Sequence, residues 1–239
     1  MLIHLDTIDG TSLAQEPYNF TFQLSNPIRD CTSLVLKSLE LPVNFPNCRD
    51  GLNTLVVQIN GSQITITVPE AQYVDTASLV TAFNIAAANQ ITMSVSASNQ
   101  VSLSATTPFT LRQTNFAAYI LGFRNQFGVQ SVGNSITASI AVNLSPDNYI
   151  MLSIQGVRSV TTIVTNNDRL RAAQFKVPLN AVSGVVYFTS DEVTYKQATQ
   201  LDPAQVITQI GVQLLDRFGN PLYGGTTPNY DYSITFEAV

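Results

Sequence analysis

Short stretches of alternating polar and apolar residues run along almost the whole chain. Near the N-terminus Phe20, Phe22 and Leu24 alternate with polar neighbours, as in a strand that buries one face. The same alternation, or a run of β-branched residues, recurs between clusters of Pro, Gly and Asn in the segments 18–25, 32–41, 54–60, 63–68, 101–106 and 206–216. The pattern predicts a mainly β protein.

The first 45 residues are predicted to form two strands. Asn26-Pro27 indicates a turn between them, and Pro42 ends the second strand because a proline removes a ladder donor.

Residues 46–130 have a different character. Asn60-Gly61 between two apolar runs predicts a hairpin. Asp75 is a candidate N-cap for a helix whose apolar stripe comprises Ala77, Leu79, Ala82, Phe83, Ala86 and Ala87. A second hairpin through 93–103, a strand at 109–111 and a helical turn over 116–123 capped by Gly122 follow. We predict a ββαββ subdomain over 46–130.

The remaining residues, 131–239, return to the all-β pattern. Candidate strands cover 136–142, 149–154, 175–179, 185–188, 206–215 and 232–236. Two strands before the subdomain and about six after it give eight, the number in a jelly roll. The sequence therefore predicts one eight-stranded jelly-roll sandwich, formed by 1–45 and 131–239, with the subdomain inserted. No sequence repeat indicates a duplicated jelly roll.

Charge is scarce along the 239 residues. Charged residues make up 11%, against roughly 25% in ordinary soluble domains. A chain with few Lys and Glu and many hydroxyl and amide side chains suits extended packing against neighbours, because charges are depleted at interface cores.

The charge balance also limits the classes of partner. A net charge of -5 argues against direct binding to nucleic acid. The nearest approach to a basic patch is Arg169, Arg171 and Lys176, which we interpret as a solvated loop and strand edge.

The sequence contains no apolar run of the roughly 20 residues that cross a bilayer, and no signal peptide is visible at the N-terminus. Cys31 and Cys48 are therefore expected to be free thiols in a reducing compartment, with a disulfide between them as the alternative.

The sequence gives little support for a catalytic site or a metal site. The single histidine, His4, lies next to a terminus that we expect to be mobile, so a catalytic triad is not predicted. One histidine and two separated cysteines cannot make a zinc site. Asn166, Asn167 and Asp168 match no calcium loop and read as a turn.

Glycoside hydrolysis needs only two carboxylates and is the remaining enzyme hypothesis. Asp191 and Glu192 are adjacent and would point to opposite faces of a strand. The other candidates, Glu40, Glu70 and Asp216, are isolated, and no tryptophan is present to stack on a sugar. The segment 223–226 lacks the lysine and helix of a phosphate loop. We predict no catalytic, cofactor or metal site, and no enzyme.

Aromatic residues are assigned first to the sandwich core. This group comprises Tyr18, Phe20, Phe22, Tyr149, Tyr187, Phe188, Tyr232 and Phe236. Phe218, Tyr223 and Tyr230, near the last turn, are either packed in the same way or exposed contacts.

Four stretches carry a resemblance to a known family. They are Asn19 to Leu24 with Leu34 to Pro42, then Ile64 to Tyr73 leading into the helix at Leu79, then Tyr119 to Phe123, and finally Val212 to Leu222 with its closing strand to Phe236. Their order resembles the penton (vertex) and minor capsid proteins of double-stranded DNA viruses with a double jelly-roll major shell protein, such as virophages, polinton-like viruses and giant-virus relatives. Gln72 stands where that family usually has a glycine.

This resemblance implies a single jelly roll, five copies of which form the five-fold vertex of an icosahedral shell. It implies a homopentamer that contacts the neighbouring major capsid protein, resides in the virion, and is made and assembled inside the host cell. The alternative is a viral or phage host-recognition or carbohydrate-binding β module, such as a tail or fibre domain.

Overall fold

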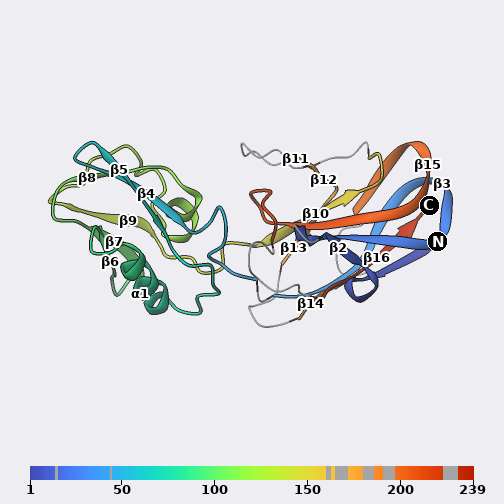
Figure 1. Cartoon of the computed structure of the whole chain (residues 1–239), viewed down its shortest axis with the longest axis horizontal. Coiled ribbons are helices and arrows are strands. Elements are labelled where there is room, and N and C mark those ends of the chain that lie inside the picture. The colour runs from blue at the N-terminus through green and yellow to red at the C-terminus, as the bar shows by residue number, and fades with distance from the viewer. Residues whose placement is uncertain are drawn as a thin grey trace. The chain divides into compact units, whose positions relative to one another are not determined.

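The structure is a computed structural model of the whole chain. It describes residues 1–13, 16–43, 45–159, 163–164, 172–179, 186–190, 197–222 and 231–239. The chain divides into two compact units: a sandwich unit, Met1–Phe45 with Asp147–Val239, and a central unit, Pro46–Pro146 (Figure 1). Both are built mainly from antiparallel strands, so the predicted mainly β class is confirmed.

The sandwich unit has two hydrogen-bonded layers that share two long strands, β3 (Glu16–Pro42) and β15 (Gln197–Leu215). The first layer consists of β2 (Thr11–Leu13), the first half of β3, the second half of β15, β10 (Tyr149–Gln155) and β13 (Phe175–Pro178). The second layer consists of β1 (Leu2–Asp6), β16 (Ser233–Ala238), the second half of β3, the first half of β15 and β14 (Val186–Ser190). A separate pair joins β11 (Ile163–Val164) to β12 (Ala172–Ala173).

The long pair passes from one layer to the other through three register shifts. Between the pairs Gln23–Gln209 and Ile28–Ile207, β3 advances five residues while β15 advances two. Extra residues of this kind bend a strand and increase its twist. Figure 1 shows β3 and β15 turning over together near the chain termini. The turn predicted at Asn26-Pro27 is therefore wrong: these exposed residues lie in a bulge of one continuous strand.

One apolar core lies between the layers. The Phe175 ring on β13 packs against Phe236 on β16, with 5.6 Å between ring centroids. Phe20 on β3 meets Tyr232 edge-on, also at 5.6 Å. These contacts join opposite layers, which shows that alternate residues of each strand point inward, as the polar–apolar pattern predicts.

The N-terminus is ordered, contrary to expectation. β1 pairs with β16 from Leu2 to Asp6, and the Met1 amino group donates to the Ala238 carbonyl at 2.7 Å. His4 Nδ1 lies 3.0 Å from Thr235 Oγ1 on the outer side of this pair. Five residues that include a histidine and an aspartate are a weak sequence signal for a strand, which is why β1 was not predicted. Pairing with β16 orders this segment.

The central unit contains two small sheets and one α-helix. The sheets are β5-β4-β8, from Ser62–Thr67, Thr54–Ile59 and Phe109–Leu111, and β6-β7-β9, from Thr92–Val95, Gln100–Ser104 and Ser135–Ala141. The helix α1 (Thr76–Ala86) begins at Asp75, whose carboxylate accepts from Ser78 N at 2.7 Å, as predicted. The Asn60-Gly61 hairpin is also confirmed. Of the predicted helix stripe, Leu79, Phe83 and Ala87 are buried but Ala77 is exposed.

The end of the central unit lies later in the chain than predicted. The expected boundary at residue 130 is wrong, because β9 (Ser135–Ala141) pairs with β7 and so belongs to the central unit. Asn47 closes the unit where the chain enters and leaves it: its buried amide donates to the carbonyls of Tyr73 and Leu144, both at 2.8 Å, and accepts from Tyr73 N at 3.0 Å.

The predicted helical turn at 116–123 takes the form of a π-helical turn, η2 (Phe116–Ile120). Gly122 follows at φ +83° and lies directly against the backbone of β9. Phe116, Ile120 and Phe123 are fully buried in the core of the central unit. In the part of the chain that the structure describes, no helix has the length and apolarity needed to cross a bilayer.

Candidate functional site: the outer faces of the sandwich

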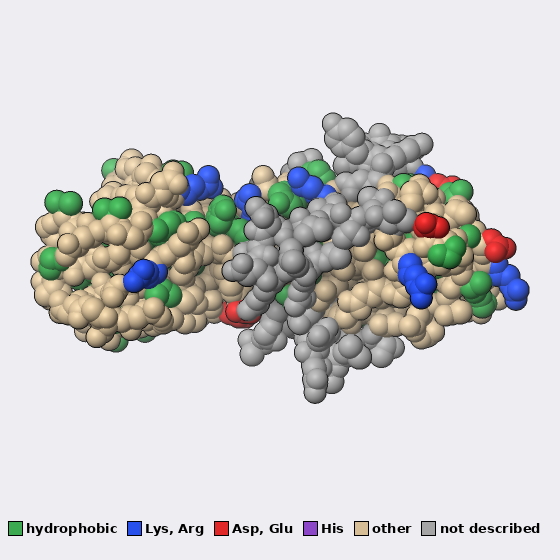
Figure 2. Space-filling model, turned by 90° about the horizontal axis from the view of Figure 1, so that it is seen from above, with side chains coloured by type: hydrophobic (Ala, Val, Ile, Leu, Met, Phe, Trp, Pro, Cys, Tyr) green, Lys and Arg blue, Asp and Glu red, His purple; other side chains and the backbone are tan. Residues whose placement is uncertain are grey.

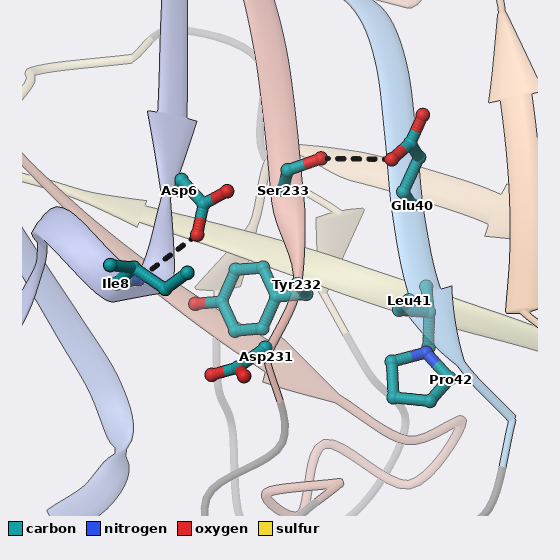
Figure 3. Close-up of a pocket in the computed structure, with 8 residues that line it drawn as sticks. All are labelled: Asp6, Ile8, Glu40, Leu41, Pro42, Asp231, Tyr232 and Ser233. Carbon is teal, nitrogen blue, oxygen red and sulfur yellow. Dashed lines mark hydrogen bonds between the residues drawn. The ribbon is translucent and has the colours of Figure 1, made fainter.

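An acidic hollow lies on the outer side of the second layer, where β1 and β3 end and β16 begins (Figure 3). Its volume is about 260 Å³. Three carboxylates line it, from Asp6, Glu40 and Asp231, together with Ile8, Leu41, Pro42, Tyr232 and Ser233. No basic side chain is among these eight residues.

Each of the three carboxylates accepts a hydrogen bond that holds it in place. Asp6 Oδ1 accepts from Ile8 N at 3.0 Å and so caps the short 3₁₀ turn η1 (Thr7–Asp9). Ser233 Oγ donates to Glu40 Oε2 at 3.4 Å, and Thr7 Oγ1 donates to Asp231 Oδ1 at 3.4 Å. Segments more than 190 positions apart in the sequence therefore place three negative charges at one hollow.

The hollow has the features of a contact surface. Glu40 and Asp231 are exposed, so neither lies in an apolar pocket of the kind that holds the general acid of a glycosidase. Among the described residues, no group of three His, Cys, Asp or Glu is placed to hold a metal ion. Ile8 is 78% exposed beside the carboxylates and offers an apolar contact.

A basic cluster lies on the outer side of the first layer. Lys176 is exposed on β13, and its Nζ is 4.1 Å from the ring centroid of Tyr149. Arg217, just after β15, places its guanidinium carbon 5.8 Å from the same centroid. Cation–π contacts of this length hold both positive groups over one aromatic ring. We call these three residues the basic cluster.

The outer side of the first layer also carries amide side chains. In register, Asn19 pairs with Gln213, Thr21 with Gly211 and Gln23 with Gln209. Gln23 Nε2 donates to Gln209 Oε1 at 2.9 Å. Asn19 and Gln213 are already buried within the chain, whereas Gln23 and Gln209 are exposed, and an uncharged pair is cheaper to bury against a neighbour than a charged one. Charged side chains are also sparse in Figure 2, where Lys, Arg, Asp and Glu are scattered singly on the face in view.

The central unit has a hollow of its own, about 330 Å³ in volume. Its apolar members include Val129 and Val132, which are 57% and 87% exposed, and the half-buried Ile136. The other lining residues are uncharged and polar: Asn125, Gln126, Gln130, Ser131, Ser135 and Thr137.

The structure does not bring together at one site the described carboxylates that the sequence offered as catalytic candidates. Asp216 is fully buried and accepts from Phe218 N and Asn220 N, at 2.8 and 2.9 Å, so it holds a turn. Glu70 belongs to the central unit, and Glu40 meets two aspartates that the sequence did not single out. Arg169, Arg171, Asn166 to Asp168, Asp191, Glu192 and 223–226 lie outside the described residues.

The two cysteines are separate, buried thiols, so the predicted free state is confirmed and the disulfide is not formed. Cys31 belongs to the sandwich unit and Cys48 to the central unit. Burial raises the pKa of Cys48 to about 12, although Arg49 acts in the opposite direction. Burial likewise raises the pKa of Cys31. Neither thiol is a reactive group in the folded protein.

Of the aromatic core assignments that can be checked, four are confirmed and Tyr149 is wrong. Phe20, Phe22, Tyr232 and Phe236 are core residues, and Phe218 is buried rather than an exposed contact. Tyr149 is half-buried and carries the basic cluster instead of joining the main core. The side chains of Tyr18, Tyr187 and Phe188, and residues Tyr223 and Tyr230, lie outside the described set.

The sequence did not reveal the acidic hollow or the basic cluster. Asp6, Asp231, Tyr149 and Arg217 are unremarkable in their local sequence, and only strand pairing brings them to their partners. The available signal was alternation: Glu40 between Leu39 and Leu41, and Lys176 between Phe175 and Val177, had to point outward.

Neither a protein-family model nor a curated protein matches the sequence. Among solved structures, the mavirus penton protein matches with a TM-score of 0.51 and 10% sequence identity, over 100% of both chains. A chain in the cryo-EM structure of the Sputnik virophage aligns with a TM-score of 0.42 and 12% identity, over 98% of this chain and 97% of that one. The resemblance to penton proteins seen in the sequence is confirmed at the level of the fold by the mavirus match.

Proposed function

We propose that this protein is a structural capsid protein, and that five copies of it form the five-fold vertex of an icosahedral double-stranded DNA virus. The observation that carries the proposal is the likeness to the mavirus penton protein over the entire length of both chains. The aligned region covers both units of this chain.

We further propose that the sandwich unit is a single jelly roll. Its strand orders, β1-β16-β3-β14 in the second layer and β3-β15-β10-β13 in the first, support this assignment. Eight separate strands form the two layers, the number in a jelly roll, and β3 and β15 each contribute to both layers. In this assignment the central unit is an insertion between the end of β3 and the start of β10.

The charge-poor surface supports a role in permanent assembly. Large permanent interfaces bury 2,000 Å² or more and tolerate few unpaired charges. The proposed partners are four further copies of the chain and the neighbouring major capsid protein, without direct contact to nucleic acid. The proposed location is the virion shell, after synthesis and assembly inside the host cell, and the role is not enzymatic.

The mass of the purified protein tests this proposal. Native mass spectrometry and light scattering over a range of concentrations should give pentamers, and electron-microscope class averages should show five-fold symmetry. A chain that remains monomeric throughout would contradict a self-assembling vertex protein. Trimers, together with binding on a glycan array, would instead favour the host-recognition or carbohydrate-binding module.

A further inference from the structure

We infer that the central unit carries an open sheet edge, β5, which pairs with β5 of a second copy of this chain. Backbone hydrogen bonds join the two strands in antiparallel fashion across a two-fold axis. The sheet β8-β4-β5 of one copy then continues into the same sheet of the other. This surface goes beyond the proposed vertex function and does not depend on it.

The outward backbone groups of β5 follow from its pairing with β4. Val68 N donates to Asn53 O at 2.9 Å, and hydrogen-bonded pairs alternate with non-hydrogen-bonded pairs along an antiparallel ladder. The backbone N–H and C=O groups of Gln63, Thr65 and Thr67 therefore point away from β4. No hydrogen bond reaches these groups from the described residues, which include the whole central unit, and all three residues are exposed.

Two other strand edges of the central unit are closed by amide side chains. On β6, the Asn84 side chain donates to Met93 O at 3.0 Å and accepts from Met93 N at 2.7 Å, as a neighbouring strand would. On β9, the Gln126 side chain donates to Thr137 O at 2.7 Å and accepts from Ser139 N at 2.9 Å. Each amide therefore occupies the place of a further strand.

The edge of β8 is closed by the chain that follows it. Gly128 N donates to Leu111 O at 2.9 Å, and Ser131 N donates to Phe109 O at 2.8 Å. By contrast, β5 contains no proline, no charged residue and no register shift, the features that commonly protect an edge. An edge of this kind is a template for an added strand.

The sequence of β5 makes it a suitable partner for itself. Antiparallel pairing about Thr65 sets Thr65 opposite Thr65 of the other copy, and Gln63 opposite Thr67, so every outward backbone group finds a partner. The facing side chains are uncharged, and threonine pairs stabilise a sheet. On the inner face, the half-buried Ile64 comes to lie beside Ile66 of the other copy and loses exposed area.

The charge of the central unit also favours a second copy as the partner. The unit contains three basic and three acidic residues, so its formal net charge is zero, whereas the whole chain carries -5. These residues are Arg49, Arg112, Arg124, Asp50, Glu70 and Asp75. Two central units therefore approach each other without net repulsion. One strand from each copy makes a small interface, so the pairing depends on concentration.

Substitutions at Thr65 test the contact in the full-length protein. Thr65→Pro removes the central outward donor but leaves the ladder with β4 intact, because that ladder does not use this N–H group. Thr65→Val keeps the donor and is the matched control. Thr65→Lys and Thr65→Glu each place like charges at the two-fold axis, and an equal mixture of the two places opposite charges there. Ser94→Lys adds the same charge at an exposed position of β6, whose edge is closed.

Analytical ultracentrifugation and native mass spectrometry over a range of concentrations measure association, and circular dichroism melting establishes that each variant is folded. Hydrogen exchange locates the contact. The amides of Gln63, Thr65 and Thr67 should gain at least tenfold protection as the wild-type concentration rises. The amides of Ile64 and Ile66 already face β4 and should not change.

We expect the proline, lysine and glutamate variants of Thr65 to pair through β5 at least tenfold more weakly than the wild type. The equal mixture of Thr65→Lys and Thr65→Glu should recover most of the loss, and Thr65→Val and Ser94→Lys should pair normally. If Thr65→Pro does not fold, the lysine and glutamate variants and their mixture decide. A mixture that pairs no better than either variant alone overturns the contact, as does normal pairing by a folded Thr65→Pro.

The outcomes separate this contact from the vertex function. Species heavier than five copies that Thr65→Pro reduces to pentamers support both. Pentamers without heavier species, and with unprotected β5 amides, overturn the contact and leave the vertex function intact. Dimers with protected β5 amides and no pentamers support the contact and overturn the vertex function. A wild-type chain that stays monomeric at every concentration overturns both.

Discussion

Gly122→Ala should destabilise the central unit strongly, because this glycine meets two demands at once. Its φ of +83° lies in the left-handed region. An ideal Cβ at this position would overlap the carbonyl oxygen of Ile140, with the carbonyl carbon at 2.9 Å and the Ala141 oxygen at 3.3 Å. Gly122 also belongs to one of the stretches that carry the penton resemblance, so the test addresses why a glycine stands there.

The expected magnitude has two parts. An alanine in the left-handed region costs about 1–2 kcal/mol. Forcing extra atoms into a packed site adds about 1–3 kcal/mol, and the neighbour here is backbone of β9 (Ser135–Ala141), which cannot rotate aside. Gly122→Ala should therefore lower the free energy of unfolding of the central unit by about 2–5 kcal/mol.

Gly128→Ala is the matched control. Gly128 lies in the same unit at φ +76°, but an added Cβ would find no atom within 4 Å. It should cost only the backbone term of about 1–2 kcal/mol. Urea unfolding monitored by circular dichroism gives both values. Hydrogen exchange of the Ile140 and Asn143 amides, which donate to Gly122 and Ile120, localises the effect. A difference between the two variants below about 0.5 kcal/mol would refute the packing argument.

Three further predictions concern the central unit. Asn47→Ala should lower its free energy of unfolding by about 3 kcal/mol, at about 1 kcal/mol for each lost hydrogen bond to Tyr73 and Leu144, in urea titrations. The fragment 46–146 should fold alone and give dispersed NMR signals, because it has its own core; a collapsed spectrum would contradict this. Cys48 should be inert to thiol reagents at pH 8 until the protein is denatured. Because the pKa of Cys48 is higher in the folded protein, the neutral thiol stabilises the fold below about pH 9, and this stabilisation is lost as the pH rises toward 12. From pH 8 to 10 the free energy of unfolding of the wild type should therefore fall by about 1.4 kcal/mol more than that of Cys48→Ala.

Features set by neighbouring residues could be predicted from the sequence. The Asp75 cap and the Asn60-Gly61 turn depend on atoms a few positions apart, and both are found where expected. Asn60 and Gly61 have φ of +49° and +80°, the left-handed values that favour this pair of residues in a tight hairpin. Leu79 and Phe83 are likewise buried one helical turn apart.

Features that depend on distant partners could not be predicted. Asn26-Pro27 is an ordinary turn signal, yet β15 continues past it and makes it a bulge in β3. β9 has the same local pattern as its successors in the sandwich, and only its pairing with β7 assigns it to the central unit. Both errors arose because the partner of a strand lies far away in the sequence.

Alternation along the chain was enough to predict which side chains point inward, because a period of two assigns alternate residues such as Phe20 and Phe22 to one face whatever the partner strand. The tertiary structure alone decided which strands meet. A register shift of two residues preserves the alternation, so the sequence pattern cannot specify a pairing such as Phe20 with Val212. For the same reason the outward Asp6, Glu40 and Asp231 form one hollow only once β1, β3 and β16 are side by side.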